Sequence, residues 1–263
     1  TRIAFVNLLS AVLKGADTKL PVLNSVTSIP DLGPVEADEA YDNVLAFYNA
    51  GILNGADDYG SFRAFATLKR GEAAAMLARL VDPALRRTFT LKSFDLCAAV
   101  LGVAPDTVLL TVGGRAVTAE LFACQLCTSL HQRGGGARAA LEDAVSAWCC
   151  YAAPFRPLAE QLGLSLTEEE AQAEQYGRET AGYLGLSAAY WQYQQTGVLL
   201  NAKMRTLYWE KDWKNGEAAY HNDLEAMSEA LLESAELSPA LEALDLTAVY
   251  GRLAASPFPL WNF

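Results

Sequence analysis

The chain has few of the groups on which metal sites, nucleic-acid-binding proteins and membrane proteins depend. Its 263 residues include two histidines and five cysteines, and 20 basic residues stand against 31 acidic ones. The net charge of −11 makes nucleic acid a poor partner, because affinity for a phosphate backbone comes mainly from Lys and Arg. No apolar run reaches the roughly 20 residues that cross a bilayer, so we expect no membrane insertion. With 52% hydrophobic residues, the composition is that of a folded protein.

The motifs of several large enzyme classes are absent. The sequence contains no Gly-x-Ser-x-Gly, no Gly-x-x-x-x-Gly-Lys-Ser/Thr and no His-Glu-x-x-His. The glycine run at 134–136 follows a predicted helix instead of a strand, which indicates a linker. The run Glu168-Glu169-Glu170 is better explained as a charged helix N-terminus than as an acid/base cluster. We expect solvated histidines at His131 and His221, and neither a cofactor nor a metal.

The cysteines do not form the pattern of a disulfide framework, because their number is odd and the chain is long. They are Cys97, Cys124, Cys127, Cys149 and Cys150. Cys124 and Cys127 have helical spacing, but adjacent residues such as Cys149 and Cys150 point about 100° apart on a helix and rarely hold one ion. Two interpretations remain. The thiols are small buried hydrophobes, which we favour, or Cys124 and Cys127 serve a thiol-dependent enzyme.

Charge divides the chain near Pro105. Residues 1–104 carry ten basic and eleven acidic side chains, whereas residues 105–263 carry ten and twenty. The turn-forming segment 102–105 lies at this step, so we predict two domains, 1–104 and 105–263. In the first, apolar periodicity predicts helices over 3–13, 44–52, 73–81 and 94–101.

Part of the first domain resembles an S-layer homology repeat. The resemblance is carried by residues 41–55 (YDNVLAFYNAGILNG), 60–63 (GSFR) and 68–80 (LKRGEAAAMLARL). Repeats of this family have an aromatic-rich helix ending in Gly-Ile, a Gly-x-x-Asp-Gly-x-Phe-Arg-Pro loop, and a Thr-Arg-Ala-Glu motif that opens a second helix. Here the loop has one extra residue, Ala64 replaces the proline, and Lys69-Arg70-Gly71-Glu72 stands at the position of the motif.

The first four residues, Thr1-Arg2-Ile3-Ala4, resemble the same motif from a preceding repeat, without its glutamate. We therefore predict a half repeat over 1–28, a full repeat over 29–83 and a linker helix over 84–104. Because the apolar pattern starts directly at Thr1, we expect a preceding segment, and a secretory signal with it, to have been removed.

The resemblance implies binding to an anionic secondary cell-wall polysaccharide, often pyruvylated, with the motif arginine on the acidic sugar. A guanidinium matches a carboxylate bidentately, and the first turn of a helix adds the positive end of its dipole. The alternative is that Arg70 pairs with an acidic residue of a neighbouring helix. The predicted glycan-binding residues are Arg70, Glu72, Lys69, Arg63, Gly55, Asp58, Gly60, Phe62 and Arg2. We also expect Phe62 to anchor its loop in the core.

The second domain resembles the N-terminal chaperone domain of secreted foldases of the SurA and PrsA type. Residues 112–118 match the hairpin that opens this family, 159–170 match the end of its long helix, and 185–187 match the start of a further helix. From the residues themselves, Gly113-Gly114 predicts a hairpin turn. Apolar positions continue over 139–162, and Thr167 with Glu170 forms a capping-box signature.

These foldases commonly insert a parvulin prolyl-isomerase domain after the helix that here ends near Trp209 or Trp213. Only fifty residues follow Trp213, and 218–232 already predicts an amphipathic helix. No room for the isomerase domain remains, so we predict that the protein is not an enzyme.

Aromatic side chains gather in the predicted helices of this domain. The predicted client-binding residues are Tyr190, Trp191, Tyr193, Trp209 and Trp213. Such side chains suit a groove for extended, unfolded polypeptides, since they give a large contact area at low entropic cost. The other interpretation is that they fill a helical core. An acidic rim around a groove would favour basic clients.

The sequence thus predicts a mainly α protein, an S-layer-homology-type helical bundle followed by a foldase-like helical domain with a small β-hairpin. We expect an extracellular, wall-associated protein of a Gram-positive-type envelope. Its expected partners are an anionic secondary cell-wall polysaccharide and unfolded or secreted proteins. The alternative is a purely structural envelope scaffold without client binding.

Overall fold

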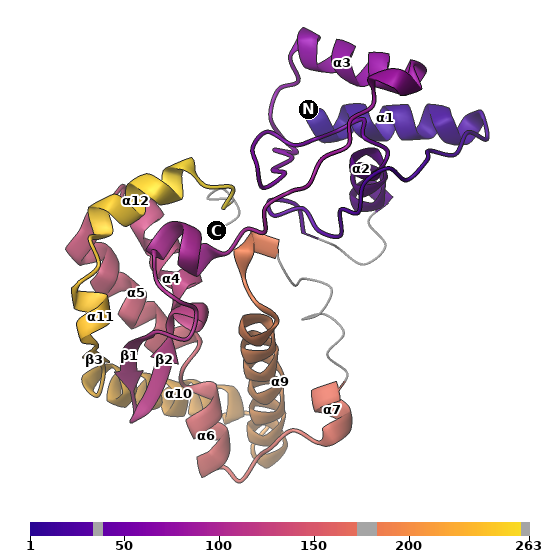
Figure 1. Cartoon of the computed structure of the whole chain (residues 1–263). Helices are drawn as coiled ribbons and strands as arrows, with labels where there is room; N and C mark the ends of the chain where they lie inside the picture. The colour runs from indigo at the N-terminus through magenta and orange to yellow at the C-terminus, as the bar shows by residue number, and fades with distance from the viewer. Residues whose placement is uncertain (34–38, 173–182, 259–263) are drawn as a thin grey trace. The chain divides into compact units, whose positions relative to one another are not determined.

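The computed structural model describes residues 1–33, 39–172 and 183–258, and its chain divides into two compact units. Unit 1 holds Thr1–Phe94 and two short segments around Leu184 and Phe258, and unit 2 holds the other described residues from Asp95 to Ser256. The described chain is mainly helical with one small antiparallel sheet (Figure 1), which confirms the predicted fold class.

The division between the units falls at Phe94, ahead of the charge step at Pro105. The reason is the short π-helical turn η2 (Cys97–Leu101), which packs on α4 (Ala119–Gln132) and α12 (Leu246–Ala255) of unit 2. Arg252 on α12 fixes the end of this turn, because its Nε donates to the carbonyl of Val100 at 2.7 Å. Residues 97–101, predicted as part of a linker helix, therefore belong to the core of unit 2.

The described part of unit 1 contains three α-helices joined by long loops. They are α1 (Arg2–Gly15), α2 (Glu39–Asn49) and α3 (Arg70–Val81), followed by the 3-10 turn η1 (Pro83–Leu85). All three helices overlap ranges that apolar periodicity predicts. A second 3-10 turn, η3 (Tyr183–Gly185), joins this unit through a hydrogen bond from Leu184 N to the carbonyl of Pro30 at 2.9 Å.

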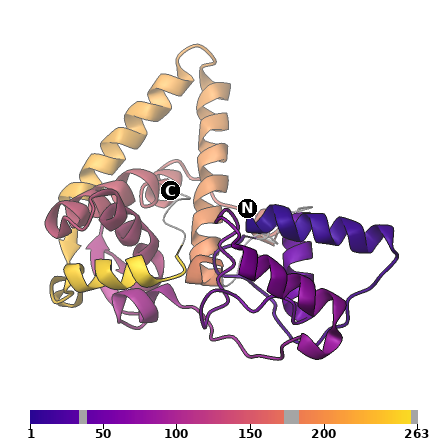
Figure 2. The ribbon, with the colours of Figure 1, turned by 90° about the horizontal axis from the view of Figure 1, so that it is seen from above.

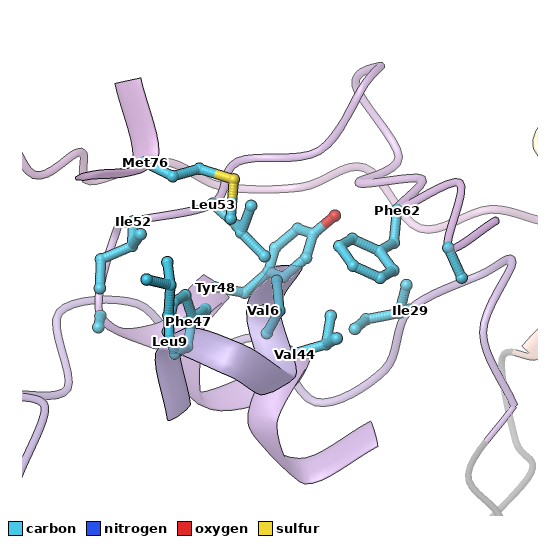
Figure 3. Close-up of a cluster of buried hydrophobic side chains, with 12 residues drawn as sticks. Val6, Leu9, Ile29, Val44, Phe47, Tyr48, Ile52, Leu53, Phe62 and Met76 are labelled. Atoms are coloured by element: carbon cyan, nitrogen blue, oxygen red, sulfur yellow. The ribbon is translucent and has the colours of Figure 1, made fainter. Parts of the chain in front are cut away.

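The core of unit 1 lies where α1 and α2 meet the loops between the helices. Figure 3 shows Val6 and Leu9 of α1 beside Val44, Phe47 and Tyr48 of α2. The loop residues that close this core are Ile29, Ile52, Leu53 and Phe62. Of the α3 side chains only Met76 is buried in the cluster. Phe62 is 0% exposed, which confirms its predicted role as the anchor of its loop.

Unit 2 begins with a hairpin of β1 (Val108–Val112) and β2 (Arg115–Thr118), and β3 (Glu236–Leu237) pairs with the other edge of β1. The turn is Gly113-Gly114, as predicted, and both glycines have positive φ, 57° and 72°. A two-residue turn with positive φ at both positions matches the twist of the flanking strands. The hairpin leads directly into α4.

Two helices form the centre of unit 2. The first turn of α4 follows the hairpin, and α5 (Ala137–Tyr151) packs against α4 after the glycine run. Phe122 of α4 contacts Trp148 of α5 edge to face, with ring centroids 6.1 Å apart. The short helix α6 (Phe155–Gln161) and the helix α7 (Glu168–Gln172) follow.

The predicted long helix over 139–162 is wrong, because α5 ends at Tyr151 and α6 begins at Phe155. Pro154 lies at the break. Proline has no N–H to donate, and it moves the residue before it away from helical geometry. The apolar pattern continues across the break because both helices bury apolar side chains, such as Trp148 and Leu158, in the same unit.

The longest helices, α9 (Ala188–Lys211) and α10 (Gly216–Glu233), form a helical hairpin whose arms diverge from the turn that joins them (Figure 2). Near the turn that joins them, Tyr208 and Tyr220 meet with ring centroids 5.7 Å apart. A Cβ at Gly216 would lie 2.2 Å from the carbonyl oxygen of Tyr208, so only glycine fits there. The last elements are α11 (Pro239–Glu242) and α12. None of the described helices is both long enough and apolar enough to span a membrane.

Candidate functional site

The two copies of the arginine motif have different surroundings. Arg2 is buried at the start of α1, where its Nε donates to the carbonyl of Phe62 at 2.8 Å. Its Nη1 pairs with Glu72 of α3 at 2.8 Å. The guanidinium carbon also lies 5.6 Å from the centroid of the Phe62 ring. Arg2 therefore joins α1, the loop and α3, and it is not available as a surface ligand.

Arg70 lies in the first turn of α3 and is exposed. No described residue gives its side chain a hydrogen bond or an ion pair, so the predicted alternative of an acidic partner is not found in this part of the chain. Glu72 is occupied, because it accepts from the backbone N–H of Lys69 at 2.8 Å and from Arg2. These contacts, the backbone one first, lower the pKa of Glu72. Arg70 is thus a motif residue whose cationic group has no partner among the described residues.

The loop before α3 is held by glycines and by a tyrosine hydroxyl. Gly55 and Gly60 both have φ of +81°, and a Cβ on Gly55 would lie 2.5 Å from Cα of Gly60. The hydroxyl of Tyr48 donates to the carbonyl of Gly60 at 2.9 Å. These two predicted glycan-binding glycines therefore shape the loop, whatever else they contact.

A buried carboxylate that the sequence analysis did not identify holds the next part of this loop. The two oxygens of Asp31 accept the backbone N–H groups of Phe62 and Arg63, each at 2.7 Å. Burial raises the pKa of Asp31, and these hydrogen bonds oppose the rise. Asp31 is thirty-one residues from Phe62 in the chain, and no local pattern links the two.

The remaining predicted glycan-binding residues differ in their exposure to solvent. Arg63 and Lys69 are exposed. Asp58 is exposed as well, but its carboxylate pairs with Lys92 at 2.7 Å, which lowers the pKa of Asp58. Phe62 is fully buried and cannot contact a ligand at the surface.

Unit 1 contains an open groove of about 640 Å³. Its walls are the segments 23–30 and 88–94, with Tyr59 between them. Seven of the lining residues carry hydroxyl groups: Ser25, Thr27, Ser28, Tyr59, Thr88, Thr90 and Ser93. Lys92 also lines the groove, and the ring of Tyr59 meets that of Phe94 at 5.3 Å. Hydroxyls, an ammonium group and an aromatic ring are the groups that bind a polar, hydroxylated ligand.

Two asparagines fix the walls of the groove. The buried side chain of Asn24 donates to the carbonyls of Tyr48 and Arg87 and accepts from the N–H of Phe89, each at 3.0 Å. Asn49 at the end of α2 exchanges two hydrogen bonds with the backbone of Val26, at 2.7 and 3.1 Å. The sequence analysis missed this groove. The available signal was the clustering of Ser and Thr over 25–28 and 88–93.

The predicted client-binding aromatics do not line one common groove. Tyr190 is 8% exposed and hydrogen-bonds the thiol of Cys124, and Trp191 is partly buried. Tyr193 stacks on Trp148 with ring centroids 5.3 Å apart. Trp209 and Trp213, in contrast, are 61% and 70% exposed. The aromatics at the start of α9 therefore belong to the core, and those at and just beyond its end face solvent.

The thiols are free, and four of the five are buried. Burial raises the pKa of Cys97 to about 12 and those of Cys124 and Cys149 to about 11, and it raises that of Cys127 well above its ordinary value. The thiolate is the reactive form of cysteine, so these environments oppose nucleophilic or redox chemistry at pH 7. The interpretation of Cys124 and Cys127 as small buried hydrophobes is the one that the structure supports.

Neither histidine is part of a paired site. His131 is exposed near the end of α4. His221 is exposed as well, and it lies 3.2 Å from Glu217 and beside the ring of Tyr220, both on its own helix. Within the described ranges, no three His, Cys, Asp or Glu side chains lie close enough together to hold a metal ion.

Comparison with family models, with curated proteins and with solved structures finds no match to this chain. The resemblances to S-layer homology repeats and to foldase chaperone domains therefore rest on the sequence motifs quoted above.

Proposed function

We propose that unit 1 binds an anionic secondary cell-wall polysaccharide and so anchors the protein non-covalently to a cell envelope. The observation that carries this proposal is the hydroxyl-lined groove with Lys92 at its wall. Sugar hydroxyls exchange hydrogen bonds with Ser, Thr and Tyr. The ion pair between Lys92 and Asp58 is exposed to solvent, so the ammonium group of Lys92 can also contact the acidic substituent of the sugar. The motif resemblance around Arg70 gives independent support.

The test is a binding assay of the full chain with purified wall polysaccharide. We expect Arg70→Ala and Lys92→Ala each to weaken binding by about tenfold, since each removes one charge-assisted hydrogen bond. The matched control is Arg138→Ala, because Arg138 is an exposed cation of α5 whose ion pair is with Glu142, one turn away. Circular dichroism and unfolding midpoints show whether the variants keep their fold.

Each outcome assigns a role. Loss with Lys92→Ala alone places the polysaccharide in the groove, whereas loss with Arg70→Ala alone places it at the first turn of α3. Binding that both variants retain at the wild-type level contradicts the proposal.

We propose in addition that unit 2 is a non-catalytic chaperone-like module, whose client surface is the end of α9 and the turn after it. Exposed Trp209 and Trp213 support this, since large exposed aromatics mark binding surfaces. The burial of Tyr190 and the stacking of partly buried Tyr193 on Trp148 instead favour the second candidate, a purely structural envelope scaffold. In neither case do we expect acceleration of proline-limited refolding.

Aggregation of a reduced, unfolded client protein separates these two candidates. A chaperone-like module slows the aggregation, and the double variant Trp209→Ala/Trp213→Ala loses most of this effect. Tyr151→Ala is the control, because Tyr151 is an equally exposed aromatic, at 76%, on another helix of the unit. If the wild-type protein leaves aggregation unchanged, the scaffold is the better description.

A further inference from the structure

A second, smaller cavity of about 150 Å³ lies in unit 2, where the β1–β2 hairpin meets α5, α6 and α9. Its volume is several times that which one water molecule requires. Apolar side chains make up much of its wall, among them Val112, Val117, Leu121, Pro157 and Leu231. The polar groups in the wall come mainly from Arg115, Arg156, Trp148 and Tyr193. Among the described residues, no Asp or Glu lines it.

Two residues of the cavity wall each carry a buried donor that has no acceptor among the described residues. The donors are Nε1 of Trp148, a residue only 2% exposed, and Nη1 of Arg156. Buried N–H groups are nearly always hydrogen-bonded, because an unpaired one loses its water without compensation. A guanidinium and an indole N–H are donors only, so the missing partner is a group that accepts hydrogen bonds.

The arginine is held in place for such a partner. Its guanidinium carbon lies 3.7 Å from the centroid of the Tyr193 ring, and Tyr193 in turn stacks on Trp148 at an interplanar angle of 20°. The Nη2 of Arg156 donates to the backbone carbonyl of Tyr193 at 3.1 Å, which leaves Nη1 free. A guanidinium that is already fixed loses little conformational entropy when it binds.

The charge at the cavity has the opposite sign to that of the surrounding part of the chain. Arg115 is paired with Glu160 at 2.6 Å, so the positive charge of Arg156 is left over. Residues 105–263 carry ten basic and twenty acidic side chains. A cavity with a net positive wall inside an acidic unit selects an anion over a neutral ligand.

We propose that this cavity binds a carboxylate group carried on a short apolar chain. The carboxylate accepts from Arg156 and Trp148, and the apolar part packs against Val112, Val117 and Leu231. The C-terminus of a polypeptide and a free short-chain carboxylate share this chemistry. The inference goes beyond the proposed function, since it requires neither wall binding nor exposed Trp209 and Trp213.

The test follows the indole N–H signals of the ¹⁵N-labelled full chain by NMR. The chain has five tryptophans, and Trp148→Phe identifies the signal of Trp148. The probes are butyrate, its neutral analogue butyramide, and a short peptide ending in valine with either a free or an amidated C-terminus. We expect the free carboxylates to move the Trp148 signal in a saturable way and the neutral analogues to leave it in place.

Saturation with the peptide but not with butyrate identifies a polypeptide C-terminus as the source, and saturation with butyrate alone identifies a free carboxylate. Arg156→Gln weakens binding at least about tenfold, whereas Arg138→Gln, which removes the same charge at an exposed position, does not. If the amide probes move the signal as much as the acids, or if no probe moves it, the proposal is overturned. The acid and amide comparison on the wild-type chain stands even if Arg156→Gln fails to fold.

Discussion

At the scale of single residues, two arginines of one sequence motif have opposite roles. Arg2 is 9% exposed and bonds both the loop carbonyl of Phe62 and the carboxylate of Glu72. Arg70 is exposed and has no such partner among the described residues. A buried charged donor stabilises a fold because its removal leaves its acceptors unpaired, whereas an exposed cation contributes little to stability.

This contrast gives a stability prediction. We expect Arg2→Ala to lower the free energy of unfolding by about 2–3 kcal/mol, because a largely buried guanidinium and its two hydrogen bonds are lost. Arg70→Ala should change it by less than about 0.5 kcal/mol, as is usual for surface substitutions. Urea unfolding followed by circular dichroism measures both. Equal effects of the two substitutions would contradict the roles assigned here.

The sequence predicts these residues as one class because a motif records residue types and spacing and not burial. Arg2 and Glu72 are 70 positions apart in the chain, and Asp31 is 31 positions from Phe62, whose N–H it accepts. Phe62 is the opposite case. A large aromatic side chain in a loop of turn-forming Gly and Asp residues leaves water by packing into the core beneath the loop. The burial of Phe62 was therefore predictable from the local sequence.

At the scale of elements, α7 shows how a local signal and a distant contact combine. The predicted capping box is confirmed, because Thr167 N donates to Glu170 at 2.7 Å and Glu170 N donates to the Thr167 hydroxyl at 3.2 Å. The same carboxylate pairs with Lys203 of α9 at 2.6 Å. Lys203 also donates to the carbonyl of Ser165 at 3.0 Å. The ion pair therefore fastens the capped segment to α9.

The pairing makes the stability of unit 2 depend on pH. Hydrogen bonds from Lys203 and Thr167 lower the pKa of Glu170 to about 2, from an ordinary value of 4.5. A carboxylate with a lowered pKa stabilises the fold above its unfolded pKa, and this contribution is lost as pH falls from 4.5 towards 2. We expect Glu170→Gln to lower the urea midpoint at pH 7 and to have a much smaller effect at pH 2, where the carboxyl is about half protonated in the folded chain.

The matched control is Glu169→Gln, which removes the same charge from the neighbouring residue. Glu169 is exposed, and its carboxylate has no partner among the described residues. It should leave the midpoint nearly unchanged at both pH values. A Glu170→Gln effect of equal size at pH 7 and pH 2 would show that the carboxylate's charge is not the source of the stabilisation.

Elements with local signals are the ones that the sequence predicts well. The Gly113-Gly114 turn, the cap at Thr167 and the helices of unit 1 each follow from neighbouring residues. The helix over 139–162 fails because periodicity reports which face is buried and not whether the backbone is continuous. Pro154 was the residue in the sequence that indicated the end of the helix. The groove over 23–30 and 88–94 was not predicted for another reason. Asn24 and Phe89, whose hydrogen bond joins its two walls, are 65 residues apart in the chain.

At the scale of the whole molecule, the five thiols all belong to unit 2. Cys97, Cys124, Cys127 and Cys149 are at most 5% exposed, and Cys150 is intermediate. Reagents reach such buried groups only when the surrounding structure opens. The raised pKa values of the four buried thiols lower their reactivity further.

Alkylation with iodoacetamide at pH 7.5, read by mass spectrometry of the intact chain and of its peptides, should therefore label Cys150 alone on the time scale of minutes. In 6 M guanidinium chloride all five thiols should react at similar rates, because unfolding removes the burial that protects four of them. The ratio of the two rates at Cys127 then measures how rarely unit 2 opens. Rapid native labelling of Cys124 or Cys127 would contradict their burial, and it would restore the thiol-dependent enzyme as the better account of unit 2.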